Sequence, residues 1–181
     1  MTVRHLSRPH PRVRRTVLAL CAVTAAAVSA LSVAAVPSAG AAPPACRTGG
    51  LVIWMDTQGN GTAGTIFYTL NLTNLSGHTC TLRGFPGVSA VNLRGSRLGR
   101  AAARDTGQTV RTITLAAGRT AHATLGIVDI GVLPTSSCPP TTAAGLRVFP
   151  PNQTTSKVIP FPFAACARGG ATFLRIRPVT R

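Results

Sequence analysis

Acidic side chains are almost absent from this 181-residue chain, which has no glutamate and only the aspartates Asp56, Asp105 and Asp129. Glycosidases need two placed carboxyl groups and calcium loops need several, so both classes are disfavoured. The stretch Asp56-x-Gln58-x-Asn60-Gly61 resembles the start of a calcium loop, but Phe67 stands where the closing bidentate glutamate belongs. We expect a plain turn there, no bound metal and no cofactor.

Catalytic bases and nucleophiles are also scarce. After residue 41 the only histidines are His78 and His122, and no serine lies in a Gly-x-Ser-x-Gly elbow. A Ser-His-Asp hydrolase therefore has no recognisable site. The cysteines lack Cys-x-x-Cys spacing, which counts against a zinc centre. We expect a protein that is not an enzyme, and the alternative is an extracellular hydrolase of cell-wall material with an unrecognised site.

The N-terminus has the pattern of a secretory signal peptide. Five arginines within residues 4–15 precede an apolar, alanine-rich segment from Val17 to Val36, followed by Pro37-Ser38-Ala39-Gly40-Ala41. Small residues at Ala39 and Ala41 predict cleavage after Ala41. We expect residues 1–41 to be removed and residues 42–181 to form one secreted, extracellular domain with no transmembrane segment. An uncleaved anchor is the competing interpretation, and Arg14-Arg15 leaves twin-arginine export open beside the general route.

Positive charge dominates the rest of the chain. Fourteen of the 19 basic residues lie after residue 41 against three aspartates, a net charge of +11, and Lys157 is the only lysine. Such a field favours anionic partners, although codon bias in a GC-rich genome can also raise the arginine count. The densest cluster, our candidate contact with an anionic cell-envelope polymer or surface, is Arg94, Arg97, Arg100 and Arg104. Without interleaved aromatic residues we expect no specific nucleic-acid binding, and a solvated loop is the alternative.

Four cysteines remain after residue 41: Cys46, Cys80, Cys138 and Cys166. An even number in an exported chain indicates two disulfides, for which three pairings exist. We expect Cys46–Cys80 and Cys138–Cys166, because both of these sequence-local loops can close while the chain folds in order.

Short β-type runs separated by glycine, proline, asparagine and serine fill residues 51–181, and no segment there has a 3.6-residue period. In the clearest run, Ile66, Tyr68, Leu70 and Leu72 alternate with mostly polar residues, which predicts one buried face. Turns are predicted between the runs, one of them at Gly59-Asn60-Gly61. We expect an all-β, antiparallel, immunoglobulin-like β-sandwich. The predicted strands are 51–55, 65–73, 79–82, 88–93, 109–115, 121–128, 146–149, 157–161 and 172–179.

The segment from Asn71 to Val88, NLTNLSGHTCTLRGFPGV, resembles a secreted actinobacterial family called domain of unknown function 4232. The Leu115-Ala116-Ala117-Gly118 turn, the stretch 146–151 and the later cysteines extend the resemblance over essentially all of residues 42–181. The resemblance implies secretion and an immunoglobulin-like sandwich but supplies no activity. We therefore expect a non-enzymatic binding or structural module at or outside the cell envelope.

Overall fold

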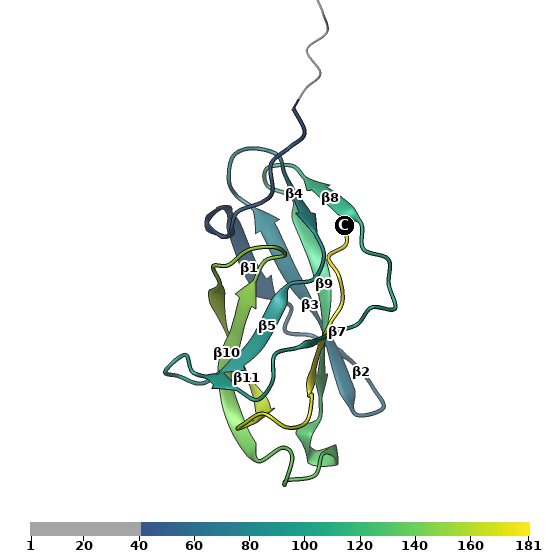
Figure 1. The fold of residues 1–181 in the computed structure, drawn as a ribbon, viewed down its shortest axis with the longest axis vertical. Helices are drawn as coiled ribbons and strands as arrows, with labels where there is room; N and C mark the ends of the chain where they lie inside the picture. The colour runs from purple at the N-terminus through teal and green to yellow at the C-terminus, as the bar shows by residue number, and fades with distance from the viewer. Residues whose placement is uncertain (1–40) are drawn as a thin grey trace, which may run out of the picture. The chain divides into compact units, whose positions relative to one another are not determined.

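The structure, a computed structural model, describes residues 41–181 and is all-β, as the sequence predicts (Figure 1). The predicted signal peptide lies outside the described residues, apart from Ala41. Strands β1 to β12 form three sheets. A short 3-10 helix, η1 (Thr48–Gly50), precedes β1, and a second, η2 (Ile130–Val132), lies between β9 and β10 in the chain.

The largest sheet has six strands in the order β1-β3-β9-β12-β7, with β2 also paired to β3. All of its pairs are antiparallel except the short parallel pair of β12 with β7. Its strands are β1 (Leu51–Met55), β2 (Asn60–Thr62), β3 (Thr65–Asn74), β7 (Ala103–Arg104), β9 (Thr120–Val128) and β12 (Leu174–Ile176).

The other two sheets are antiparallel. One has the order β11-β10-β5-β6 and the other pairs β4 with β8. Their strands are β4 (Cys80–Arg83), β5 (Gly87–Val91), β6 (Arg97–Leu98), β8 (Thr112–Leu115), β10 (Pro140–Phe149) and β11 (Lys157–Cys166).

A single hydrophobic core joins the three sheets. Its fully buried members include Leu72 and Leu125 from the six-stranded sheet, Leu146 from the four-stranded sheet and Leu82 from the two-stranded sheet. Burying a side chain of this size stabilises the fold by about 1.5–3 kcal/mol. Because each sheet contributes to the same cluster, the described residues fold around one core.

The predicted buried face of strand 65–73 is correct only in part. Leu70 and Leu72 are fully buried, but Ile66 is 42% exposed. Ile66 and Tyr68 line an open hollow of about 430 Å³ over this end of β3, so this part of the face is not covered.

The turn predicted at Gly59-Asn60-Gly61 is wrong in its position. Asn60 and Gly61 belong to β2, which pairs with β3 in a hairpin. The chain reverses at Ala63 and Gly64, whose φ values of 44° and 73° are both left-handed. Two successive positive φ angles match the right-handed twist of a two-residue hairpin, which explains why the turn falls here.

Candidate functional site

Both disulfides join the cysteines that loop locality pairs in the sequence. Cys46 is bonded to Cys80 with 4.9 Å between Cα atoms, and Cys138 to Cys166 with 4.6 Å. Disulfides persist in oxidising environments, so these two indicate such a compartment for the folded protein. Within residues 41–181, no helix has both the length and the apolar character to span a bilayer.

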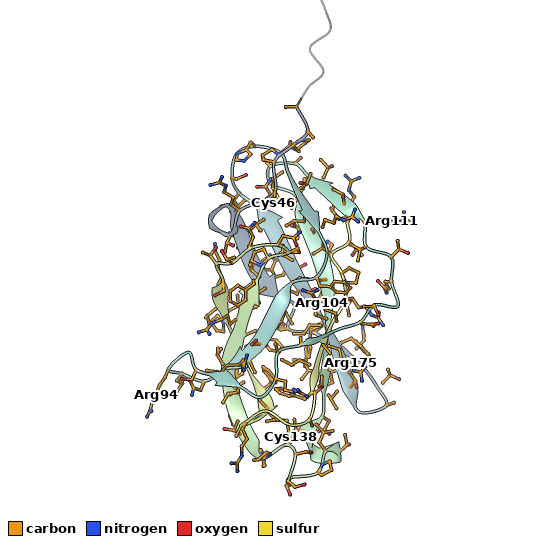
Figure 2. All side chains as sticks on the ribbon, viewed as in Figure 1. Cys46, Arg94, Arg104, Arg111, Cys138 and Arg175 are labelled. Atoms are coloured by element: carbon orange, nitrogen blue, oxygen red, sulfur yellow. A yellow bond between two sulfur atoms is a disulfide. The ribbon has the colours of Figure 1, made fainter. Side chains whose placement is uncertain are left out.

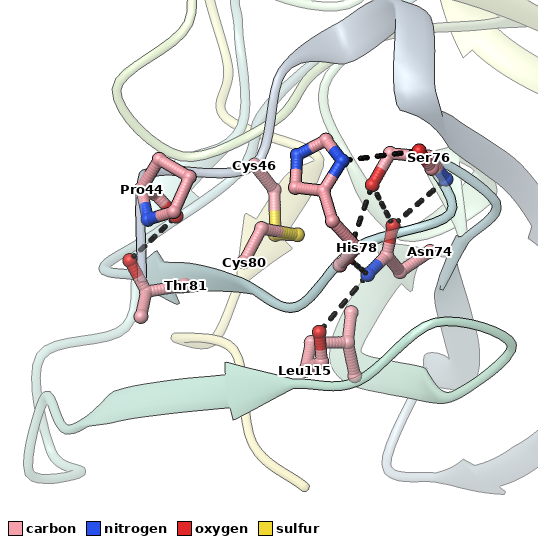
Figure 3. Close-up of a disulfide and its surroundings, with 8 residues drawn as sticks. All are labelled: Pro44, Cys46, Asn74, Ser76, His78, Cys80, Thr81 and Leu115. Atoms are coloured by element: carbon pink, nitrogen blue, oxygen red, sulfur yellow. Dashed lines mark hydrogen bonds between the residues drawn. A yellow bond between two sulfur atoms is a disulfide. The ribbon is translucent and has the colours of Figure 1, made fainter. Parts of the chain in front are cut away.

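Around the first disulfide, a buried asparagine organises the loop between β3 and β4 (Figure 3). Asn74 is fully buried, and its Nδ2 donates to the carbonyl oxygens of His78 (2.8 Å) and Leu115 (2.9 Å). Its Oδ1 accepts from the backbone N–H and the hydroxyl of Ser76, at 3.0 and 2.7 Å. The family-like Asn-Leu-Ser-Gly stretch therefore has a structural task, which is to tie this loop to β8 beside the Cys80 bridge.

The four clustered arginines are all exposed but do not form one patch. Arg94 lies in the turn between β5 and β6, and Arg97 begins β6 in the four-stranded sheet. Arg104 ends β7 in the six-stranded sheet. Figure 2 shows Arg94 at a projecting tip, well away from Arg104. The cluster is thus a string of charges along the connection from one sheet to the other.

The turn that carries Arg94 is held in place by polar contacts. Asn92 Oδ1 accepts from the backbone N–H groups of Arg94 (3.0 Å) and Ser96 (2.9 Å). Arg147 Nη2 donates to the carbonyl oxygen of Gly95 at 2.7 Å. Leu93 at the same tip is 96% exposed. The turn therefore presents its side chains to solvent from a fixed backbone.

Two of the four guanidinium groups have neutral contacts. Arg100 Nη1 donates to the carbonyl oxygen of Gly170 at 3.5 Å, and Arg104 Cζ lies 5.6 Å from the centroid of the Phe85 ring. Neither contact neutralises charge, so these arginines keep their full positive potential.

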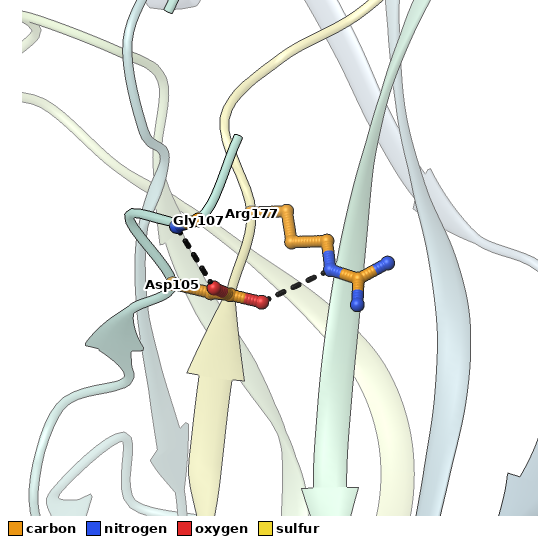
Figure 4. A network of polar contacts seen from close by, with 3 residues as sticks. All are labelled: Asp105, Gly107 and Arg177. Atoms are coloured by element: carbon orange, nitrogen blue, oxygen red, sulfur yellow. Dashed lines mark hydrogen bonds and ion pairs between the residues drawn. The ribbon is translucent and has the colours of Figure 1, made fainter. Parts of the chain in front are cut away.

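A second group of basic residues, Arg175 and Arg177, lies near Asp105, and the sequence pattern did not reveal it (Figure 4 shows Asp105 with Arg177). Arg177 Nε donates to Asp105 Oδ2 at 3.1 Å, and the backbone N–H of Gly107 donates to Oδ1 at 3.2 Å. The Arg177 hydrogen bond, followed by that of Gly107, lowers the pKa of Asp105, and the charges of Arg177 and Arg175 act in the same direction while desolvation opposes them. Asp105 and Arg177 lie 72 residues apart, so only the fold brings them together.

Arg175 and Arg177 also line a hollow of about 340 Å³ on the six-stranded sheet. The guanidinium carbon of Arg177 lies 5.5 Å from the centroid of the Phe67 ring, a cation–π distance. Phe67 in turn lies across Gly126, its partner on β9. Asp105 balances the charge of one of the two arginines, so the residues that line the hollow carry a net positive charge.

A row of hydrogen-bonded side chains, Asp56, Asn71 and His122, lies on another part of the same sheet. Asn71 is 2% exposed, and its Nδ2 donates to Asp56 Oδ1 at 3.1 Å. His122 Nδ1 donates to Asn71 Oδ1 at 2.7 Å, because an amide oxygen can only accept. The side chain of His122 is half-buried on β9.

These features define a small all-β domain with one core and two disulfides. The model of the family described as Domain of unknown function (DUF4232) matches residues 46–180, and the chain belongs to this family. No curated protein and no solved structure matches the chain.

Proposed function

We propose that this protein is a secreted, non-enzymatic binding module at or outside the cell envelope, which holds an anionic polymer or surface through its arginines. The signal-like N-terminus and the two disulfides support an extracellular location. We also propose that its two larger sheets pack as an immunoglobulin-like sandwich, since both contribute to the same core. A crystal structure of the exported protein tests that arrangement.

One observation carries the functional proposal. Among the 14 basic side chains of residues 41–181, Arg177 alone forms a salt bridge. Asp56 bonds Asn71, and Asp129 accepts from the backbone N–H of Gly131. A domain with so many guanidinium groups that lack an acidic partner attracts polyanions. Arginine also suits phosphate, because its guanidinium group can donate two parallel hydrogen bonds to it.

Phosphate is the chemistry that a teichoic acid and an anionic lipid surface share. Each phosphate neutralised by an arginine releases counterions, so affinity falls steeply as salt rises. With several arginines engaged, binding weakens by orders of magnitude between roughly 50 and 200 mM salt.

The test measures binding to purified poly(glycerol phosphate) and to phosphatidylglycerol vesicles over a salt series, with neutral phosphatidylcholine vesicles as the reference. The test variant replaces Arg94, Arg97, Arg100 and Arg104 with serine. We expect a flatter salt dependence and an unchanged fold, because exposed charges contribute little to stability. The anion that loses binding in the variant identifies the source of the phosphate.

A matched variant controls for net charge. Replacing Arg47, Arg111, Arg119 and Arg168 with serine removes the same four charges, and these side chains are also exposed. We expect this control to lose less affinity than the test variant. Equal salt slopes for the wild type and the Arg94–Arg104 variant would show that the cluster is a solvated segment and overturn the proposal.

A further inference from the structure

The only tryptophan of the chain, Trp54, lies on β1 at an edge of the six-stranded sheet and is 45% exposed. Its Nε1 donates to Thr73 Oγ1 at 3.2 Å, and that hydroxyl lies 3.0 Å from Thr120 Oγ1. The hydrogen bond satisfies the one polar atom of the indole and orients the ring. What remains exposed is therefore an apolar aromatic surface in a fixed position.

Trp54 borders a hollow of about 650 Å³ that is otherwise lined by mostly polar residues. Asp56 Oδ1 accepts from Asn71, whereas Asp56 Oδ2 has no hydrogen-bond partner in the part of the chain that the structure describes. Gln58 and Asn60 are exposed, and their side chains form no hydrogen bond within residues 41–181. The hollow thus places a carboxylate oxygen and two amides, all open to a ligand, beside an aromatic ring. Its other lining residues are Met55, Thr57 and Thr69.

The charge of this hollow narrows the ligand class. No basic residue lines it, and its one carboxylate repels anions. A cation is disfavoured by the positive field of the domain, whose net charge after residue 41 is +11 from 14 basic residues and three aspartates. A neutral ligand with an apolar face and several hydroxyl groups suits these properties.

We propose that the Trp54 hollow binds a neutral saccharide. The C–H face of a pyranose ring packs against the indole, hydroxyl groups donate to Asp56 Oδ2, and the amides of Gln58 and Asn60 donate to ring or hydroxyl oxygens. This site uses none of the arginines in the proposed anion contact. It adds a second, uncharged mode of recognition suited to the sugars of an envelope polymer.

The single tryptophan supplies the readout. Intrinsic fluorescence of the folded protein is titrated with soluble neutral trisaccharides of glucose, N-acetylglucosamine, mannose, galactose and arabinose. We expect a saturable change in emission with at least one of them. Because the ligand is uncharged, its affinity stays constant over the salt range that weakens the arginine contact.

Three variants locate the binding. Asp56→Asn keeps an acceptor for Asn71 and keeps the tryptophan, so fluorescence still reports on it. Trp54→Ala, measured by calorimetry, loses about tenfold or more in affinity, as expected when aromatic stacking and its buried area are removed. Val52→Ala is the matched control, because Val52 lies on the same strand, is 42% exposed and does not line the hollow. Circular dichroism verifies that each variant folds.

The outcomes separate this proposal from the preceding one. Weaker sugar binding in the Trp54 and Asp56 variants, with Val52→Ala unchanged, supports the saccharide site. Absence of saturable binding to every trisaccharide, or full binding by Trp54→Ala, overturns it. Loss of sugar binding in the Arg94–Arg104 variant also overturns it, because binding would then depend on the arginine cluster. None of these results alters the salt-slope test of the arginines.

Discussion

Asn71 and His122 face each other across β3 and β9, with 2.7 Å between Asn71 Oδ1 and His122 Nδ1. Asn71 is almost fully buried and also donates to Asp56, so its amide satisfies groups on two neighbouring elements. Asn71→Ala leaves those groups without their partner. We expect a loss of about 1–3 kcal/mol in the free energy of unfolding, measured by urea denaturation.

Thr69→Ala is the control for this prediction. Thr69 lies two residues earlier on the same strand, and its side chain forms no hydrogen bond within the described part of the chain. A loss from Thr69→Ala as large as that from Asn71→Ala would show that the amide bonds are not responsible.

The sequence predicted the bounds of some strands closely but predicted others much too short. The run 51–55 coincides with β1, and 121–128 differs from β9 by one residue. By contrast, β10 and β11 extend to Pro140–Phe149 and Lys157–Cys166, well beyond the predicted 146–149 and 157–161. Pro160 and Pro162 are tolerated in β11 because it is an edge strand, where a missing backbone N–H costs no ladder hydrogen bond.

Long-range polar contacts are the part of the candidate sites that the sequence did not predict. The cysteine pairing follows from loop length and compartment, both of which the sequence supplies. The contacts of Asn71 with His122 and of Asp105 with Arg177 span 51 and 72 residues. No local pattern encodes those distances. Likewise, the sequence alone did not show that the four clustered arginines are distributed between two sheets and do not form one patch.

The Asp105–Arg177 pair gives the protein a pH-dependent contribution to stability. The folded-state pKa of Asp105 lies below its ordinary value of 3.8. A lowered pKa means that this contribution is fully present above the unfolded-state pKa and is lost as pH falls through the folded-state pKa. We expect wild type to be more stable than Asp105→Asn at neutral pH and the difference to shrink below about pH 4. Unfolding curves from pH 7 to pH 2 measure it.

Both side chains of this pair are more than a third exposed, at 38% for Arg177 and 37% for Asp105, so salt screens their attraction. Raising the salt concentration at neutral pH should therefore narrow the gap between wild type and Asp105→Asn. A gap that persists unchanged at pH 2 would contradict the assignment to Asp105 ionisation.

Gly145 pairs with Pro160 directly after the register shift between β10 and β11, which lies between Ala143 and Gly145. A Cβ atom there would overlap the carbonyl oxygen of Ile159, and this backbone atom cannot swing aside as a side-chain tip can. We expect Gly145→Ala to destabilise the protein by about 1–3 kcal/mol through overpacking, measured by thermal and urea unfolding. Gly49→Ala is the control, because nothing lies within 4 Å of a Cβ at that position. Equal stability of the two variants would refute the steric explanation.

The two disulfides close separate loops, with sequence separations of 34 and 28 residues that do not overlap. Removing either pair by double alanine substitution should cost about 3–4 kcal/mol through the regained entropy of the unfolded chain. Figure 2 places Cys46 and Cys138 near opposite ends of the domain. Because the loops are independent and the sites distant, we expect the two losses to add within about 0.5 kcal/mol in a variant lacking both, measured by urea unfolding. A larger departure from additivity would mean that the bridges stabilise a shared element.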